Sequence, residues 1–174
     1  MNRMRKGLLL AALQLLIVLS LGGKLLYDRA TRPRVWALCQ VYDPDLPIRG
    51  RYLSEQLRVP AEGFTYVQPN GVQNEWWTNQ QWAYFEARDG RLIAKAQGRG
   101  SAGWVFLHRN ADGTLEATSR EAVLLFIPDR ANAPALKRGE EMWVEVTVPK
   151  QGPPRPIRIA IKTKEGAFTP VKTG

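Results

Sequence analysis

The segment WAYFEARDGRLIAKA, residues 82–96, decides the fold class of this chain. Trp82, Tyr84 and Glu86 fall on one face of an extended chain, and Ala83, Phe85 and Ala87 fall on the other. This is the period-two pattern of a strand with one buried face. Asp89-Gly90 follows, a dipeptide that readily adopts the positive φ angles of a two-residue hairpin turn. Arg91 to Ala96 then returns as a second strand. The segment therefore predicts an antiparallel β-hairpin.

The same pattern, punctuated by glycine and proline, extends over the rest of the chain after Pro33. No amphipathic helix of ten or more residues is predicted there, because no stretch shows a sustained 3.6-residue period. We expect one all-β domain, either an antiparallel sandwich or a partly closed barrel. Seven further strands are predicted, at residues 35–42, 51–59, 104–108, 114–118, 122–127, 142–148 and 157–162.

A long apolar stretch, residues 7–27, lies between a basic head, residues 1–6, and this domain. About 20 apolar residues match the roughly 30 Å hydrocarbon core of a bilayer at about 1.5 Å per residue. The stretch predicts a transmembrane signal anchor, and the positive-inside rule places the basic head in the cytoplasm. A cleaved signal peptide is the alternative, but its apolar core is typically about 7–15 residues, and Ser20-Leu21-Gly22 is a poor cleavage site.

The exported part comprises a predicted linker, residues 28–34, and one β domain, residues 35–174. Pro33 ends any continuation of the anchor helix, and so short a linker spans at most roughly 20 Å at about 3.3–3.6 Å per residue. Four of the 25 basic residues and none of the 16 acidic residues precede Asp28, so the exported part carries +5 of the net charge of +9. This excess favours anionic lipid headgroups or an acidic partner, or is a solvated surface. An exported domain rarely meets nucleic acid.

Candidate catalytic and metal-binding residues are few. His108 and Cys39 are the only histidine and cysteine, so a zinc site would need at least two carboxylates, and we expect Cys39 to be a small buried hydrophobic residue. A Ser-His-Asp triad would combine His108 with Ser54, Ser101 or Ser119, none of which lies in a G-x-S-x-G elbow. A Ser-Lys dyad remains open, and the sequence has no phosphate-binding loop or dinucleotide fingerprint. We predict no catalytic residue, no metal site and no cofactor.

An aromatic cluster, Trp76, Trp77, Trp82, Tyr84 and Phe85, lies within ten residues among several Asn and Gln side chains. Ring faces can stack on a ligand while amides supply paired hydrogen bonds, so the cluster is typical of a carbohydrate or peptide groove. We predict a binding site at Trp76, Trp77, Trp82 and Tyr84. The alternative is structural: Trp82 and Phe85 would belong to the core, and Trp76 and Trp77 would cap a barrel end or touch the membrane interface.

The stretch VYDPDLPIRGRYLSEQL, residues 41–57, resembles the opening signature of the GDYXXLXY family, bacterial membrane-anchored proteins of unknown biochemical function. Phe126 to Asp129 is also similar to the family's Phe-x-Pro-Glu segment. The chain departs from the signature at Arg51, Glu55 and Leu57, where the family has Asp, Leu and Tyr. The matching residues are Asp43, Pro44, Asp45, Leu46, Arg49, Gly50 and Tyr52.

These matching residues predict a structural clamp between a loop and a strand. Asp45 can accept hydrogen bonds from loop amides, Gly50 permits a positive φ angle, and Tyr52 packs as the first strand residue. The resemblance implies a subunit of a membrane complex, and it supplies no catalytic residue.

Together these features predict a single-pass protein of the bacterial inner membrane, with its N-terminus in the cytoplasm and its C-terminal domain in the periplasm or extracellular space. We expect a binding or structural subunit of a membrane or envelope complex rather than an enzyme. Its expected partners are the lipid bilayer and an integral membrane or envelope protein, and not nucleic acid. The alternatives are a cell-wall glycan- or peptide-binding module or enzyme that uses Trp76, Trp77 and Trp82, and an exported serine hydrolase.

Overall fold

The computed structural model describes residues 3–43, 52–68, 78–126 and 136–171. The chain divides into two compact units, residues Met1–Arg32 and Pro33–Gly174. Several residues singled out in the sequence lie outside the described ranges, namely Pro44, Asp45, Leu46, Arg49, Gly50, Arg51, Trp76, Trp77 and residues 127–129.

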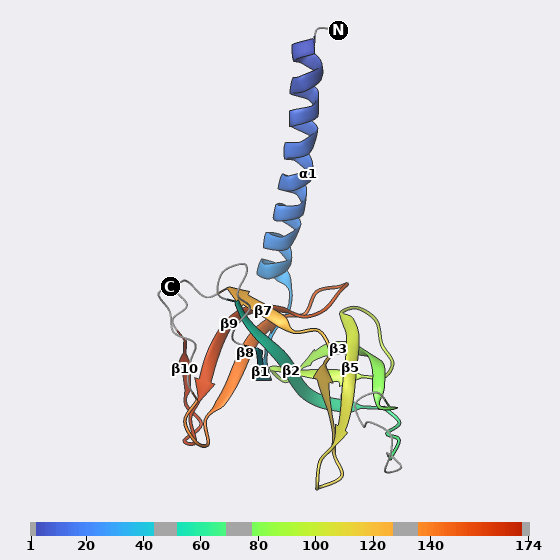
Figure 1. Cartoon of the computed structure of the whole chain (residues 1–174), viewed down its shortest axis with the longest axis vertical. Helices are drawn as coiled ribbons and strands as arrows, with labels where there is room; N and C mark the ends of the chain where they lie inside the picture. Colours follow the sequence, from blue (N-terminus) through green and yellow to red (C-terminus); the bar gives the residue numbers. More distant parts are fainter. Residues whose placement is uncertain (1–2, 44–51, 69–77, 127–135, 172–174) are drawn as a thin grey trace. The chain divides into compact units, whose positions relative to one another are not determined.

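The first unit is built on helix α1, Arg3–Thr31 (Figure 1). From Lys6 onward this helix is long and apolar enough to cross a membrane, a test that a signal sequence also passes, and none of its most apolar part is buried. The helix continues four residues beyond its predicted end at residue 27. Asp28 Oδ1 and Arg32 Nε form an ion pair of 3.1 Å, one helical turn apart, which stabilises this last turn.

The connection that follows the helix is shorter than predicted. Pro33 cannot donate the backbone hydrogen bond of a further turn, and strand β1 begins at Arg34. Only Arg32 and Pro33 separate the helix from the first strand. The predicted linker of residues 28–34 is therefore wrong, because its first half is helical and its last residue belongs to the sheet.

The second unit consists of strands, as predicted. All nine predicted strands are present, with ends that differ by at most three residues, and the short, exposed strand β10 was not predicted. The strands of the described ranges are β1 (Arg34–Asp43), β2 (Tyr52–Glu62), β3 (Gln80–Arg88), β4 (Arg91–Lys95), β5 (Ala102–Arg109), β6 (Leu115–Ser119), β7 (Val123–Phe126), β8 (Glu141–Thr147), β9 (Arg155–Lys162) and β10 (Phe168–Pro170).

The strands form one sheet in the order β10-β9-β8-β1-β4-β3-β5-β6-β2-β7. All pairings are antiparallel except two short ones made by β4. It runs parallel to β1 where Trp36 meets Arg91, and parallel to β2 where Ala61 meets Ala94. The β2–β4 pairing closes strands β2, β6, β5, β3 and β4 into a ring. The domain is therefore a partly closed barrel, and its sheet is mixed rather than wholly antiparallel.

Strands β1, β8, β9 and β10 continue the sheet away from this ring, and we call them the wing. Strand β1 belongs to both parts, since it pairs with β2 from Leu38 to Asp43 and with β8 from Arg34 to Cys39. In Figure 1, strands β8 to β10 lie on the opposite side of the domain from β3 and β5. The shared strand brings residues that are distant in sequence onto one surface.

One hydrophobic core receives residues from both the ring and the wing. On β3, Phe85 is buried and Trp82 is exposed, so the predicted alternation is confirmed. The predicted hairpin turn is confirmed too, because Asp89 and Gly90 have φ angles of 50° and 75°, as a type I′ turn requires. Fully buried apolar side chains include Leu57, Val59, Leu92, Val105, Leu107, Met142, Val144, Val146 and Ile159.

Candidate binding groove

The predicted aromatic site is only partly assembled in the described residues. Trp82 on β3 lies opposite Trp104 on β5, with ring centroids 5.4 Å apart and an edge-to-face angle of 82°. The two indoles are 45% and 41% exposed, so the alternative that placed Trp82 in the core is wrong, whereas Phe85 is buried as it expected. Tyr84 packs over Gly98, where an added β-carbon would lie 3.1 Å from the β-carbon of Tyr84.

Of the ring pair, Trp82 and Trp104, the second lines a small cavity among the described residues. The cavity that Trp104 lines measures about 10 Å³, no more than the space of one water molecule. Trp76 and Trp77 lie outside the described residues, so their part in the predicted site stays a prediction. The ring pair is thus an exposed aromatic surface on two adjacent strands.

A second aromatic surface lies on the wing. Phe168 of β10 packs against Trp36 of β1 and Trp143 of β8, with ring centroids 5.4 Å and 5.8 Å away. From β9, Arg158 Cζ lies 5.5 Å from the Trp36 ring centroid, and Lys162 Nζ lies 5.3 Å from the Trp143 ring centroid. Ring contacts and cation–π interactions therefore hold these five side chains together, and we call them the wing cluster.

Strand register places the wing cluster on the outer face of the sheet. Trp36 pairs with Glu145 across β1 and β8, and Trp143 lies two residues away, so the two indoles are diagonal neighbours. Arg158 Nε donates to Glu145 Oε2 at 2.7 Å, which neutralises that cation. Trp143 Nε1 donates to Glu141 Oε2 at 3.0 Å, which fixes the orientation of the second indole.

A groove of about 170 Å³ opens beside the wing cluster, on the outer face where β1 passes from β2 to β4. Leu38 pairs with Arg58 of β2, and Trp36 pairs with Arg91 of β4, so β1, β2 and β4 meet at this space, which β6 and β8 also line. We call this space the wing groove. Its aromatic and charged lining residues are Trp36, Arg58, Arg91, Glu116 and Trp143.

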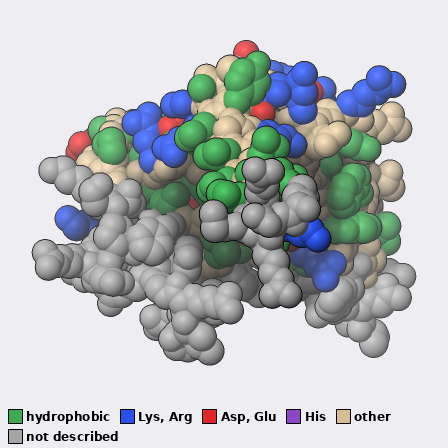
Figure 2. All heavy atoms as spheres, turned by 90° about the horizontal axis from the view of Figure 1, so that it is seen from above, with side chains coloured by type: hydrophobic (Ala, Val, Ile, Leu, Met, Phe, Trp, Pro, Cys, Tyr) green, Lys and Arg blue, Asp and Glu red, His purple; other side chains and the backbone are tan. Residues whose placement is uncertain are grey.

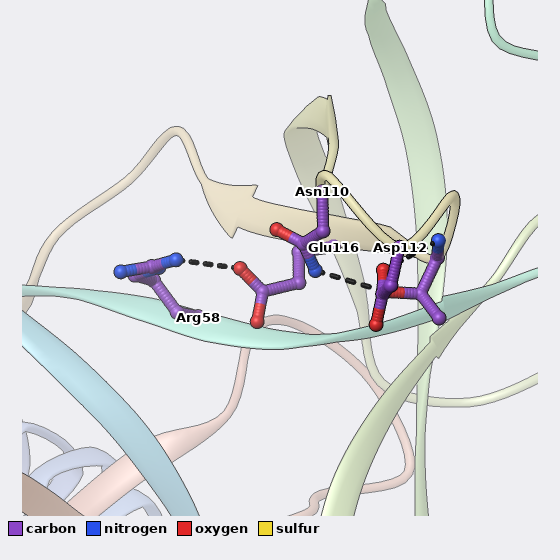
Figure 3. Close-up of polar contacts among 5 residues, drawn as sticks. Arg58, Asn110, Asp112 and Glu116 are labelled. Atoms are coloured by element: carbon purple, nitrogen blue, oxygen red, sulfur yellow. Dashed lines mark hydrogen bonds and ion pairs between the residues drawn. The ribbon is translucent and has the colours of Figure 1, made fainter.

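Within the described part of the chain, one of the two guanidinium groups of the wing groove is paired with a carboxylate and the other is not. Arg58 Nη2 donates to Glu116 Oε2 at 2.6 Å, and Figure 3 shows these two side chains pointing toward one another. Asn110 and Asp112 hydrogen bond within the turn that leads into β6 and so brace the strand that carries Glu116 (Figure 3). Arg91 forms no ion pair and no side-chain hydrogen bond with any residue that the structure describes.

Other basic side chains are dispersed over the surface. Figure 2 shows Lys and Arg side chains in several separate groups, between hydrophobic and uncharged side chains, with fewer acidic ones. Some are paired, as Arg88 Nη1 is with Glu62 Oε1 at 2.8 Å and Lys95 Nζ is with Glu86 Oε2 at 2.6 Å. On the face shown, the charge therefore follows the pattern of a solvated surface.

A buried acid lies on β2. Glu55 is 1% exposed, and neither of its carboxyl oxygens has a hydrogen-bond partner. Burial raises the pKa of Glu55 from its usual 4.5 to about 7, although the neighbouring Cys39 thiol acts to lower it. The Cys39 Sγ is directed at the Met142 carbonyl oxygen, 3.4 Å away, so the carboxyl group stays without a well-aligned donor.

Cys39, Ser101 and Ser119 are buried, and each makes a hydrogen bond within the domain. Burial raises the pKa of the Cys39 thiol, so the group stays protonated and its predicted role as a buried hydrophobic residue is confirmed. Ser119 Oγ accepts a hydrogen bond from the Leu57 amide at 2.9 Å, and Ser101 Oγ donates to the Gly152 carbonyl oxygen at 2.8 Å. Over the described ranges, no group of three or more His, Cys, Asp or Glu side chains is placed to hold a metal ion.

The predicted clamp between loop and strand is described only at its two ends. In the backbone, Asp43 pairs with Ser54 and Tyr52 pairs with Phe126. A bulge interrupts β1 between Val41 and Asp43. The residues between these ends lie outside the described ranges, so the clamp stays a prediction.

Comparisons with known proteins identify no relative. No protein-family model and no curated protein matches the sequence, and no solved structure matches the fold. The resemblance to the GDYXXLXY family therefore stays a prediction.

Sequence reasoning missed the wing groove, although part of its signal is present. The alternation along β1 places Trp36 and Leu38 opposite the buried Val35 and Ala37, and so on an outer face. Which strands lie beside that face depends on pairings with β4, β8 and β2, which are distant in sequence. A search for aromatic residues that are close together in sequence finds the cluster around Trp82 but not the wing groove, because Trp36 and Trp143 are far apart in sequence.

Proposed function

We propose that this protein is a single-pass membrane protein whose β domain, outside the cytoplasm, binds another component of a membrane or envelope complex. Helix α1 supplies the membrane-spanning segment, and the basic residues ahead of its apolar part favour an N-terminus in the cytoplasm. The domain acts by binding rather than by catalysis, and its partner is a protein.

The wing groove is the observation that carries this proposal. It combines two indoles, two guanidinium groups and a cavity on one outer face. Trp and Arg are enriched among the residues that dominate binding energy at protein interfaces, and a pocket lets such anchors exclude water. Phe168, which is 45% exposed, extends the apolar surface beyond the groove.

The short connection to the helix supports a role at the membrane surface. Arg32 and Pro33 are the only residues between α1 and β1, and two residues span at most roughly 7 Å. A domain tethered so closely to a membrane-spanning helix meets partners that are themselves in or at the bilayer.

Photo-crosslinking in intact cells tests the binding proposal. A photoreactive amino acid is placed at Leu38, which lines the groove, in the full-length chain. We expect one discrete crosslinked product with a membrane or envelope protein, and we expect Trp143→Ala to abolish it. The matched control is the same amino acid at Arg99, which is exposed and lies outside the groove. No product from Leu38, or an equal yield from Arg99, would overturn the proposal.

The orientation has its own test. A reporter that is active only outside the cytoplasm, fused after Gly174, is expected to be active in the full-length chain. Activity of a cytoplasm-specific reporter at the same position would place the domain on the other side and refute the proposed topology.

The ring pair supports a second candidate function, a module that binds cell-wall glycan or peptide. Two exposed indoles on adjacent strands offer ring faces and edges for stacking. Titration of the full chain with peptidoglycan fragments, followed by tryptophan fluorescence, is expected to show a shift that Trp82→Ala weakens and Trp36→Phe leaves unchanged. Flat titrations across the fragments would remove this candidate.

A further inference from the structure

Arg91 is the charged residue of the wing groove that forms no ion pair with any residue in the described ranges. The other groove cation, Arg58, is bound to Glu116 at 2.6 Å. The two cations of the wing cluster are bound to glutamates of β8. Arg91 has no such partner among the described residues, and Asp89, the nearest acidic residue in sequence, forms no ion pair with it. An exposed guanidinium beside two indoles therefore remains available for an anion.

The backbone of Arg91 is held in a fixed position beside Trp36. Arg91 directly follows the Asp89-Gly90 turn, whose two residues both have positive φ angles. The Trp36 amide donates to the Gly90 carbonyl oxygen at 3.1 Å, so the turn is fastened to β1. A donor whose backbone is already placed loses less conformational entropy when a ligand binds. The guanidinium and the indole are therefore presented together.

The size of the groove limits what it can hold. Pockets for drug-sized ligands measure about 300–1,000 Å³, whereas the wing groove measures about 170 Å³. This space suits one side chain of a larger molecule rather than a whole cofactor or a chain of sugar rings. A protein that projects a single side chain from an exposed segment fits this limit.

We propose that the wing groove binds one Asp or Glu side chain from an exposed segment of a partner protein. Arg91 pairs with the carboxylate, since the planar guanidinium matches a carboxylate with two parallel hydrogen bonds. An apolar residue next to that acid packs on Trp36 and Trp143. The inference rests on the proposed function, because it names the chemistry by which that partner docks.

Glu116 sets the charge preference of the groove. Its carboxylate lies on the β6 side of the same space and is already bound to Arg58. A second acid in the partner segment would meet this carboxylate and be repelled, because like charges in a partly desolvated site interact unfavourably. The groove is therefore selective for a single acid flanked by apolar residues, and not for a run of acids.

The test uses synthetic peptides and the full chain in detergent micelles. The probe is acetyl-Gly-Phe-Glu-Phe-Gly-amide, and its control has Gln in place of Glu. Binding is followed by tryptophan fluorescence and by the indole N–H resonance of Trp143, identified with Trp143→Phe. We expect the Glu peptide to bind at least tenfold more tightly than the Gln peptide, and this preference to shrink as salt is added.

Variants locate the effect. Arg91→Gln is expected to lower affinity for the Glu peptide to that for the Gln peptide, and Arg91→Lys to retain part of the preference, because charge remains and the fork is lost. Arg99→Gln, an exposed arginine outside the groove, is expected to change nothing. Near-ultraviolet circular dichroism checks that each variant is folded. Equal binding of the two peptides, or unchanged binding by Arg91→Gln, would overturn the inference.

Two further outcomes separate this inference from the proposed function. If crosslinking at Leu38 captures a membrane protein but the peptides show no charge preference, the partner remains and the acidic docking chemistry is wrong. An oligogalacturonate that binds through Arg91, while its methyl ester and both peptides do not, would make the occupant an acidic glycan and refute both statements about a protein partner.

Discussion

The ring pair and the wing cluster are two aromatic surfaces on the outside of one core, and they differ in what accompanies the indoles. Trp82 and Trp104 lie directly opposite one another and contact each other edge to face. Trp36 and Trp143 are diagonal neighbours, so Phe168 and two cations of β9 fit against them. Among the described residues, the cation–π contacts that the structure shows for tryptophan belong to the wing alone.

This difference follows from strand connectivity rather than from aromatic content. The ring pair lies inside one continuous antiparallel ladder, in which residues 80–84 of β3 pair with residues 102–106 of β5. The wing cluster lies where β1 leaves β2 and meets β4, and the divergence of these strands opens the groove. A cavity with charged walls, and not the number of tryptophans, distinguishes a surface that can hold a side chain.

The interior beneath the two surfaces also differs, and pH is expected to expose that difference most strongly. Glu55, on the strand next to β1, is a buried acid whose pKa is raised to about 7 by burial. The residues beneath the ring pair, such as Ala83, Phe85 and Val105, are apolar. The core next to β1 therefore holds a carboxyl group that titrates near neutral pH, whereas these three residues beneath the ring pair do not titrate.

The sign of this effect is set by the two states of Glu55. Between pH 4.5 and about 7 the unfolded chain loses the Glu55 proton while the folded chain keeps it, so the free energy of unfolding falls as pH rises and then levels off. The pKa difference corresponds to about 3 kcal/mol. Glu55→Leu is expected to raise the unfolding free energy at pH 8 by about this amount and to remove the decline.

Chemical denaturation of the full chain in micelles at pH 4.5, 6, 7 and 8 measures the effect. Glu55→Gln is the control, since it removes the titration but leaves an unsatisfied polar group, and it is expected to flatten the pH profile with a smaller gain in stability. If the unfolding free energy of the wild type instead stayed constant or rose between pH 4.5 and 8, the Glu55 carboxyl group would not be protonated in the folded state.

Removing one indole from each surface is expected to give the next largest difference. Trp36 is half-buried and contacts Phe168 and Arg158, so Trp36→Ala is expected to lower the unfolding free energy by about 2 kcal/mol. Trp82 is exposed and, among the described residues, has a ring contact with Trp104, so Trp82→Ala is expected to lower it by about 1 kcal/mol. Denaturation curves measured side by side check the order, and equal losses would show that the two surfaces are equivalent.

Much of the fold could be predicted because it depends on residues that are close together in sequence. Alternation and the Asp89-Gly90 turn gave the strands, since the burial of one face and a positive φ angle act within a few residues. The end of α1 was placed too early, because the ion pair between Asp28 and Arg32 extends a helix that hydropathy alone would stop. Strand β10 escaped prediction because its three residues are all exposed and show no alternation.

The candidate site could be predicted less well, because it depends on pairings between distant residues. The sequence places Trp36 on an outward face, but only the contact of β1 with β4 brings Arg91 beside it. Glu55 was noted as a departure from a family signature that has Leu there, and burial with no partner is a property of the assembled sheet. A close cluster in sequence, such as that around Trp82, is easy to detect and says little about cavities.

Coupling between the ring tryptophans sharpens the comparison at a smaller scale. A double-mutant cycle with Trp82→Ala and Trp104→Ala is expected to give a coupling free energy of about 1 kcal/mol, because the edge of one indole contacts the face of the other. The cycle of Trp82→Ala with Trp143→Ala is the control and is expected to be additive, since the two lie on different surfaces. Coupling in the control alone would mean that the surfaces communicate through the core.

The smallest expected effect compares two ion pairs. Arg58 and Glu116 line the wing groove with side chains 37% and 25% exposed, whereas Arg88 and Glu62 are 42% and 46% exposed. Exposed pairs contribute about 0.2–1 kcal/mol, and we expect the groove pair to lie in the upper part of that range and the other in the lower part.

Double-mutant cycles with Gln at each position, run at about 0.1 M and 1 M salt, measure both couplings. Raising the salt shortens the screening length from about 10 Å to about 3 Å, and screening acts most fully on charges that water surrounds. The Arg88–Glu62 coupling should therefore vanish at high salt, while part of the Arg58–Glu116 coupling survives. If both coupling free energies fell equally, water would screen charges in the wing groove as fully as on the open sheet. Arg91 would then bind a carboxylate only weakly.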